Sequence, residues 1–73
     1  MNKKELSEKL KETKVPEDAY SLSGGLPNEC FCLEEGEKWQ VYYSERGQKT
    51  QLREFEEEEV ACEYMFKMLV NMF

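Results

Sequence analysis

Residues 39–55, WQVYYSERGQKTQLREF, decide the fold that we predict for this chain. Successive side chains of a β-strand point to opposite faces of a sheet, and here Trp39, Val41 and Tyr43 alternate with Gln40, Tyr42 and Ser44. This alternation is typical of a strand with one buried face. We therefore expect part of the aromatic cluster to belong to a small core rather than to a binding surface.

The next residues predict a hairpin. Arg46-Gly47 supplies a two-residue turn, because glycine tolerates the positive φ that such turns require. The expected pairs are Glu45 with Gln48, Tyr43 with Thr50, and Val41 with Leu52. One face of the hairpin would then carry Trp39, Val41, Tyr43 and Leu52, and the other Gln40, Tyr42, Gln51 and Arg53.

The flanking segments predict two helices and one or two further strands. Asn2 and Glu5 form a capping-box variant that opens a helix over residues 1–14, weakly anchored by two leucines. A short strand is expected around Tyr20 to Leu22, followed by a Gly24-Gly25 turn and a strand over 29–34. The register of that last strand stays open, because a slip of one residue exchanges Phe31 and Leu33 for Cys30 and Cys32 on the core face.

The last segment, 56–73, is the strongest helix prediction, since its apolar residues recur at three- and four-residue steps. The fold class is therefore α+β in one domain, 1–73. A small antiparallel sheet of three to four strands, within 17–55, carries an N-terminal and a C-terminal helix on one face. The expected core consists of Trp39, Val41, Leu52, Cys62, Phe66 and Leu69, with Phe31 and Leu33 added.

Charge is sorted along the chain. The net charge is −6, yet residues 38–53 carry four basic side chains against one acid, and residues 54–73 carry six Glu against one Lys. Overall acidity disfavours a nucleic-acid ligand and fits a basic protein partner better. No apolar run is long enough to cross a bilayer, so we expect a soluble, cytoplasmic protein without a membrane interaction.

The residues that usually carry catalysis or bind metals are scarce. The chain has no His, and no Ser or Cys lies in a recognisable nucleophile motif. Three cysteines, Cys30, Cys32 and Cys62, cannot all pair, and without His they make an incomplete zinc set. We therefore expect structural thiols, no catalytic residues, no metal, no cofactor and no enzyme activity.

The order of the elements is similar to that of the double-stranded-RNA-binding domain. That family places lysines at the start of its second helix to hold phosphates. This chain has Glu56, Glu57, Glu58 and Glu59 at that position, so the resemblance does not extend to RNA binding.

A closer resemblance covers residues 15 to about 70. The pattern YSLSGGLPNE…W.VYYSERG.K..L..F..E..AC.Y resembles a family of small, mostly uncharacterised bacterial proteins of the immunity type, which neutralise toxins of competing strains. The matching positions are Tyr20, Gly24, Gly25, Trp39, Val41, Tyr42, Tyr43, Ser44, Glu45, Arg46, Gly47, Leu52, Phe55, Glu58, Ala61, Cys62 and Tyr64. The four consecutive Glu depart from the shorter acidic helix start of that family.

Two functional classes follow. The first is a small acidic protein-binding module that occludes a partner, as the immunity-like resemblance implies. The second is a self-associating protein that uses the uncovered face of the sheet, so that the chain is a monomer or a weak homodimer. The candidate partner-binding residues are Tyr42, Arg46, Lys49 and Arg53, since Tyr and Arg are enriched at interface hot spots. A structural role for Arg46, bonding carbonyls of the Gly24-Gly25 loop, is the alternative.

Overall fold

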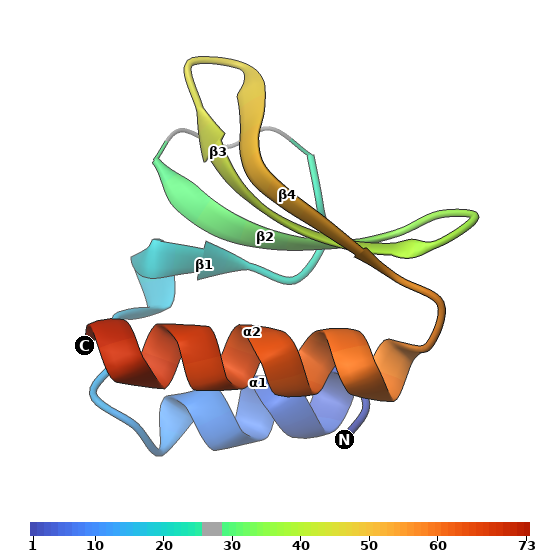
Figure 1. The fold of residues 1–73 in the computed structure, drawn as a ribbon. Coiled ribbons are helices and arrows are strands. Elements are labelled where there is room, and N and C mark those ends of the chain that lie inside the picture. The colour runs from blue at the N-terminus through green and yellow to red at the C-terminus, as the bar shows by residue number, and fades with distance from the viewer. Residues whose placement is uncertain (26–28) are drawn as a thin grey trace.

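The computed structural model describes residues 1–25 and 29–73; residues 26–28, inside the expected sheet region, lie outside this description. Two helices lie against one face of a four-stranded sheet, in agreement with the predicted fold class (Figure 1). The elements are α1 (Lys3–Lys11), the 3-10 turn η1 (Glu17–Ala19), β1 (Tyr20–Ser21), β2 (Cys30–Glu35), β3 (Trp39–Glu45), β4 (Gln48–Phe55) and α2 (Glu58–Met72). No helix in the described ranges combines the length and apolarity needed to cross a membrane.

The strands follow one another across the sheet in the order β1-β2-β3-β4. The pairs β2–β3 and β3–β4 are antiparallel, as expected, whereas the two-residue β1 runs parallel to β2. β4 is consequently an edge strand, with β3 as its one neighbour in the described sheet.

The two helices pack side by side beneath the sheet (Figure 1). Asn2 caps α1, and its side chain and that of Glu5 exchange hydrogen bonds with each other's backbone N–H, which confirms the predicted capping box. Leu6 and Leu10 are completely buried. The backbone N–H of Lys3 donates to a carboxylate oxygen of Glu58 at 2.8 Å, which joins the first turns of the two helices.

The main core lies between the helices and the sheet. Its buried members are Leu6, Leu10, Val15, Phe31, Leu33, Val41, Ala61, Cys62, Met65 and Leu69. The open register of β2 is thus settled with Phe31 and Leu33 on the helix side. Trp39 and Phe66 are partly buried and pack against this core, but the prediction that Leu52 belongs to it is wrong, because Leu52 is 40% exposed.

A β-bulge in β4 explains the error at Leu52. The pairs Glu45–Gln48 and Tyr43–Thr50 form as predicted, and Arg46 and Gly47 both have positive φ in the turn. Beyond Tyr43 the register shifts, so that Val41 lies opposite Arg53 rather than Leu52. Two residues of β4, 51 and 52, therefore span the interval that Tyr42 alone spans on β3. As a result Arg53, predicted on the far face, shares the helix side of the sheet with Val41.

The bulge makes a prediction about stability. Gln51 has a φ of 55°, in the left-handed region that costs a residue with a side chain roughly 1–2 kcal/mol. We expect Gln51→Gly to raise the free energy of unfolding by up to about 1 kcal/mol, because glycine removes this strain. Urea denaturation followed by circular dichroism measures the change.

Arg53→Gly is the matched control, because Arg53 is also exposed on β4 but has ordinary strand geometry. Glycine in a regular strand lowers stability by roughly 0.5–1 kcal/mol. Equal losses in both variants would contradict the bulge at this position.

Candidate protein-binding hairpin

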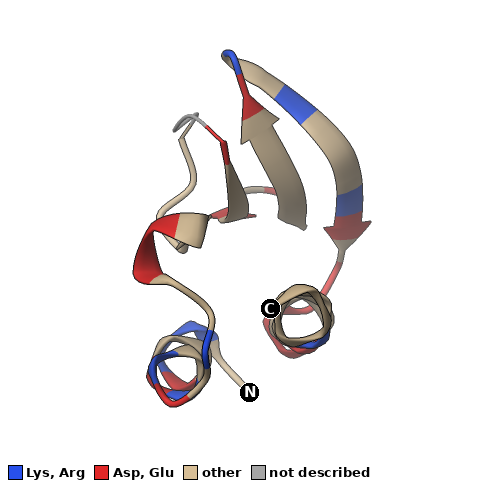
Figure 2. Cartoon of the chain, turned by 90° about the vertical axis from the view of Figure 1, so that its left-hand side faces the viewer, with Lys and Arg blue, Asp and Glu red and all other residues tan. Residues whose placement is uncertain are grey.

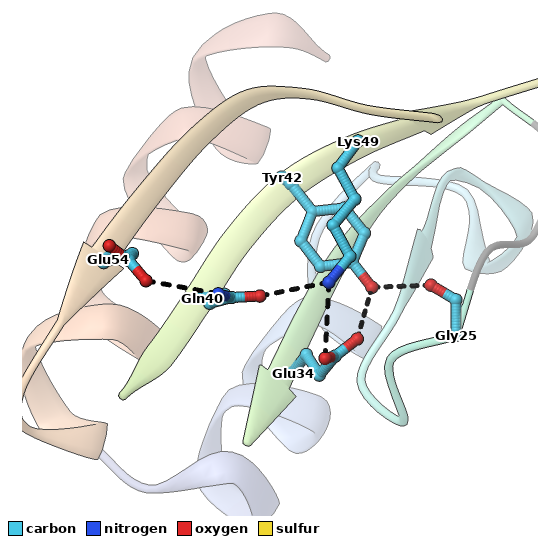
Figure 3. A network of polar contacts seen from close by, with 6 residues as sticks. All are labelled: Gly25, Glu34, Gln40, Tyr42, Lys49 and Glu54. Carbon is cyan, nitrogen blue, oxygen red and sulfur yellow. Dashed lines mark hydrogen bonds and ion pairs between the residues drawn. The ribbon is translucent and has the colours of Figure 1, made fainter. Parts of the chain in front are cut away.

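The predicted partner-binding residues all lie on the hairpin β3–β4, and a polar network links this hairpin to β2 (Figure 3). The Tyr42 hydroxyl lies 2.5 Å from the carbonyl oxygen of Gly25 and 2.8 Å from Oε1 of Glu34. Lys49 Nζ contacts Glu34 Oε2 at 3.4 Å and Gln40 Oε1 at 3.2 Å. The network therefore ties three strands and the Gly25 loop together.

The network continues to the far end of β4. Gln40 Nε2 donates to Glu54 Oε2 at 3.2 Å, so one amide side chain bridges Lys49 and Glu54. Lys49 Nζ also lies 4.7 Å from the centre of the Tyr42 ring, within the range of a cation–π interaction. Lys49 is thus held in place by three neighbours across the sheet.

The Tyr42 hydroxyl, shared between Gly25 and Glu34, determines the protonation states of Tyr42 and Glu34. Tyr42 has one hydrogen to donate, and both of its partners are acceptors when Glu34 is ionised. The hydrogen bond from Tyr42, assisted by the Lys49 ammonium, lowers the pKa of Glu34 below its ordinary value. Burial and the Glu34 carboxylate raise the pKa of Tyr42, so the pair stays as phenol and carboxylate at neutral pH.

Tyr42 does not have the exposure that the sequence predicted. It lies on the face of the sheet opposite the helices, as expected, but it is only 1% exposed and forms a second small core with Cys30 and Cys32. Tyr42 therefore cannot present its ring to a partner, and its role in the hairpin is to support the residues around it.

Gly24 allows the loop to approach this second core. Its φ is 72°, and a Cβ atom at this position would lie 2.9 Å from Cγ of Glu34. A side chain there would push the loop away from Glu34 and disturb the acceptor that Gly25 offers to Tyr42. Close contact with Glu34 as well as positive φ therefore favours glycine at position 24.

The cysteines of the second core are buried thiols. The sulfur atoms of Cys30 and Cys32 lie 3.9 Å apart, and all three cysteines of the chain are free. Burial, followed by the neighbouring Cys30, raises the pKa of Cys32 to about 12, and burial raises that of Cys62 to about 11. At neutral pH these two groups are protonated, which disfavours a role as nucleophile. Nowhere in residues 1–25 and 29–73 do three or more potential metal-binding side chains gather.

One polar atom of this core lacks a partner. Ser44 Oγ is buried beside Cys30 and has no hydrogen bond within the described part of the chain. Such an atom reduces stability, because its contacts with water are lost on folding without replacement.

The three basic candidates differ in their surroundings. Arg46 is exposed at the tip of the turn, and Lys49 is partly exposed and anchored to Glu34. Arg53 is exposed on β4, on the helix side of the sheet, and its guanidinium donates to the carbonyl of Leu52 at 3.3 Å. Together they make a basic strand and tip in an acidic chain, visible as the blue positions on the hairpin in Figure 2.

Sequence reasoning missed Glu34, Gln40 and Glu54 as members of this site. The pairs Glu34–Gln40 and Gln40–Glu54 place these side chains in one row across three strands. The signal was the polar position Gln40 between apolar neighbours, but the row could not be assembled while the register of β2 stayed open. Comparison of the chain with models of protein families, with curated proteins and with solved structures found no match. The immunity-family resemblance therefore stays a prediction.

The network predicts a specific loss in Tyr42→Phe. Removal of the hydroxyl leaves the Gly25 carbonyl and Glu34 without their shared donor, and we expect the free energy of unfolding to fall by about 1–3 kcal/mol at pH 7. Tyr43→Phe is the matched control, because no described residue bonds the Tyr43 hydroxyl and its ring contact with Phe31 is kept. This control should change stability by less than about 0.5 kcal/mol.

The loss should depend on pH in one direction. A carboxyl whose pKa is lowered by folding stabilises the protein above its unfolded pKa, and this contribution disappears as the pH falls through the folded pKa. The difference between wild type and Tyr42→Phe should therefore be largest near neutral pH and decrease below the ordinary Glu pKa of about 4.3. A difference that grows toward acid pH would contradict the assignment.

Proposed function

We propose that this chain is a small protein-binding module that covers a surface of another protein, with the hairpin β3–β4 as the contact. The observation that carries the proposal is the basic edge strand: β4 has one neighbour in the described sheet, six of its eight residues are exposed, and it begins beside a cationic turn. Natural proteins usually protect such edges, because unpaired N–H and C=O groups recruit other strands.

An edge strand can bind in a defined way. An extended segment of a partner adds to the sheet through main-chain hydrogen bonds, and side chains along the edge select the sequence. An acidic segment of the partner would suit the basic side chains of Arg46, Lys49 and Arg53. The net charge of the chain, −6, led instead to the prediction of a basic partner. We give the local charge more weight, because the field at the contact determines which surfaces fit.

The polar network of Tyr42, Glu34, Gln40 and Lys49 supports this edge from the two neighbouring strands. The Tyr42 hydroxyl bonds and the Lys49 contacts fix β3 and β4 against β2 before any partner arrives. A binding strand that is already ordered loses less conformational freedom on association. In this proposal Tyr42 contributes to binding indirectly, whereas the exposed basic residues make the contact.

The proposed biological role follows from the family resemblance. An immunity protein neutralises a toxin by occluding it, which needs a rigid surface and no catalytic centre. The high pKa values of Cys32 and Cys62 also suit a binding role better than thiol catalysis. The place of action in this proposal is the cytoplasm, where an immunity protein protects its own cell.

The test uses the protein encoded by the gene next to this one as the probe. We expect the purified pair to bind in calorimetry, and the double variant Arg46→Asn with Arg53→Glu to bind at least about 30-fold more weakly, which corresponds to a hot-spot loss of about 2 kcal/mol. Asn at position 46 tolerates the positive φ, so the turn is preserved. Lys67→Glu, an exposed charge reversal on α2, is the control and should bind like wild type.

The outcomes separate the alternatives. Equal weakening by Lys67→Glu would show that overall charge, not the hairpin, controls binding. Unchanged binding by the double variant would overturn the hairpin as the contact. A large drop in the melting temperature of Arg46→Asn alone would favour the structural role of Arg46.

A further inference from the structure

We infer that the β4 edge pairs with β4 of a second copy, in an antiparallel two-fold arrangement that covers this edge when no other partner is bound. The inference rests on the proposed use of the edge for binding and adds the means by which it is masked. Two features of β4 carry it: the distribution of its side chains over the two faces, and the distribution of its charges along the strand.

The bulge makes the face pattern of β4 symmetric. The register with β3 places Gln48, Thr50, Arg53 and Phe55 on the helix side, and Lys49 and Glu54 on the far side. In a regular strand, positions 49 and 54 would point to opposite faces because they are five residues apart. Because residues 51 and 52 together take the place of one strand residue, positions 49 and 54 point to the same face. The pattern therefore reads the same in both directions about a point between Gln51 and Leu52.

Such a pattern suits a two-fold axis through this point. In antiparallel pairing each Lys49 lies opposite Glu54 of the second copy, and each Thr50 lies opposite Arg53 of the second copy, with both members of each pair on the same face. Interfaces of this symmetry use the same patch on both chains, so every favourable contact occurs twice. The two bulges meet at the axis, and the regular segments on either side form the pairing.

The charges are complementary in the same arrangement. The β4 hairpin begins with Arg46 and Lys49, whereas Glu54, Glu56 and Glu57 follow at its end. Figure 2 shows this polarity as blue at the tip and red where β4 leads into α2. Antiparallel pairing brings the basic start of each strand to the acidic end of the other, and directly opposed opposite charges stabilise strand pairs. Parallel pairing would place like charges together.

Leu52 supplies the apolar contact at the axis. Its side chain is 40% exposed, because the bulge places Arg53 rather than Leu52 opposite Val41, and Leu52 is therefore not part of the core. At the two-fold axis each Leu52 would lie opposite Gln51 of the second copy, and the two Leu52 side chains would be close to each other on the same face. A charged side chain at position 52 should therefore prevent dimerisation while the chain still folds.

The experiment is a concentration series by analytical ultracentrifugation on the purified full chain, with no other protein present. Wild type should shift from the mass of one chain toward two. Leu52→Lys and Glu54→Lys should remain monomers at concentrations where wild type dimerises. Val70→Lys is the matched control, because Val70 is 41% exposed but lies on α2, and it should dimerise like wild type.

A charge-exchange mixture tests the register. Lys49→Glu and Glu54→Lys each place like charges opposite each other in a homodimer, so each alone should be monomeric. Mixed together, they restore both opposite-charge pairs and should form a heterodimer. Circular dichroism checks that each variant is folded. If Lys49→Glu is unfolded, the comparison of Leu52→Lys with Val70→Lys tests dimerisation through β4 instead.

Three results would overturn the inference: a wild-type monomer at every concentration, a Leu52→Lys variant that dimerises like wild type, or a mixture of folded charge variants that stays monomeric. None of them bears on the binding of the neighbouring gene product, which is measured separately. Failure of that binding, in turn, leaves the mass series unchanged.

Discussion

The bulge at positions 51 and 52 is the constraint on which the rest of this hairpin depends. It puts two residues of β4 against Tyr42, and every pair beyond it is displaced by one position. Phe55 thereby lies opposite Trp39, on the helix side, where its ring packs against that of Tyr64 of α2 in a tilted arrangement, with ring centres 5.2 Å apart. Without the extra residue, Glu54 would occupy this place, and a carboxylate would face the apolar helix.

The same displacement connects the two faces of the sheet. On the helix side it completes the main core with Phe55, and on the far side it brings Glu54 beside Gln40 and so into the row that reaches Lys49, Glu34 and Tyr42. A chain this short has little surface to bury, and a second core under the Gly25 loop adds burial that one layer of helices cannot supply. Residues of the hairpin therefore pack against other parts of the chain on both faces of the sheet.

Much of this architecture could be predicted from the sequence. The hairpin turn followed from Arg46-Gly47, the last helix from its apolar spacing, and the fold class from the order of elements. The bulge could not be predicted, because Gln51 carries no glycine signal for its positive φ. The burial of Tyr42 was missed for another reason: alternation gives the face of a strand but not what covers that face, and here the cover includes a loop 17 residues away in the chain.

The central claim is the displaced register of β3 and β4, and cross-strand nuclear Overhauser contacts in solution test it most directly. The account predicts close backbone contacts between Val41 and Arg53 and between Trp39 and Phe55, while Tyr43 contacts Thr50 as in a regular hairpin. Contacts of Val41 with Leu52 and of Trp39 with Glu54 would contradict it, because they would show a continuous register without the bulge.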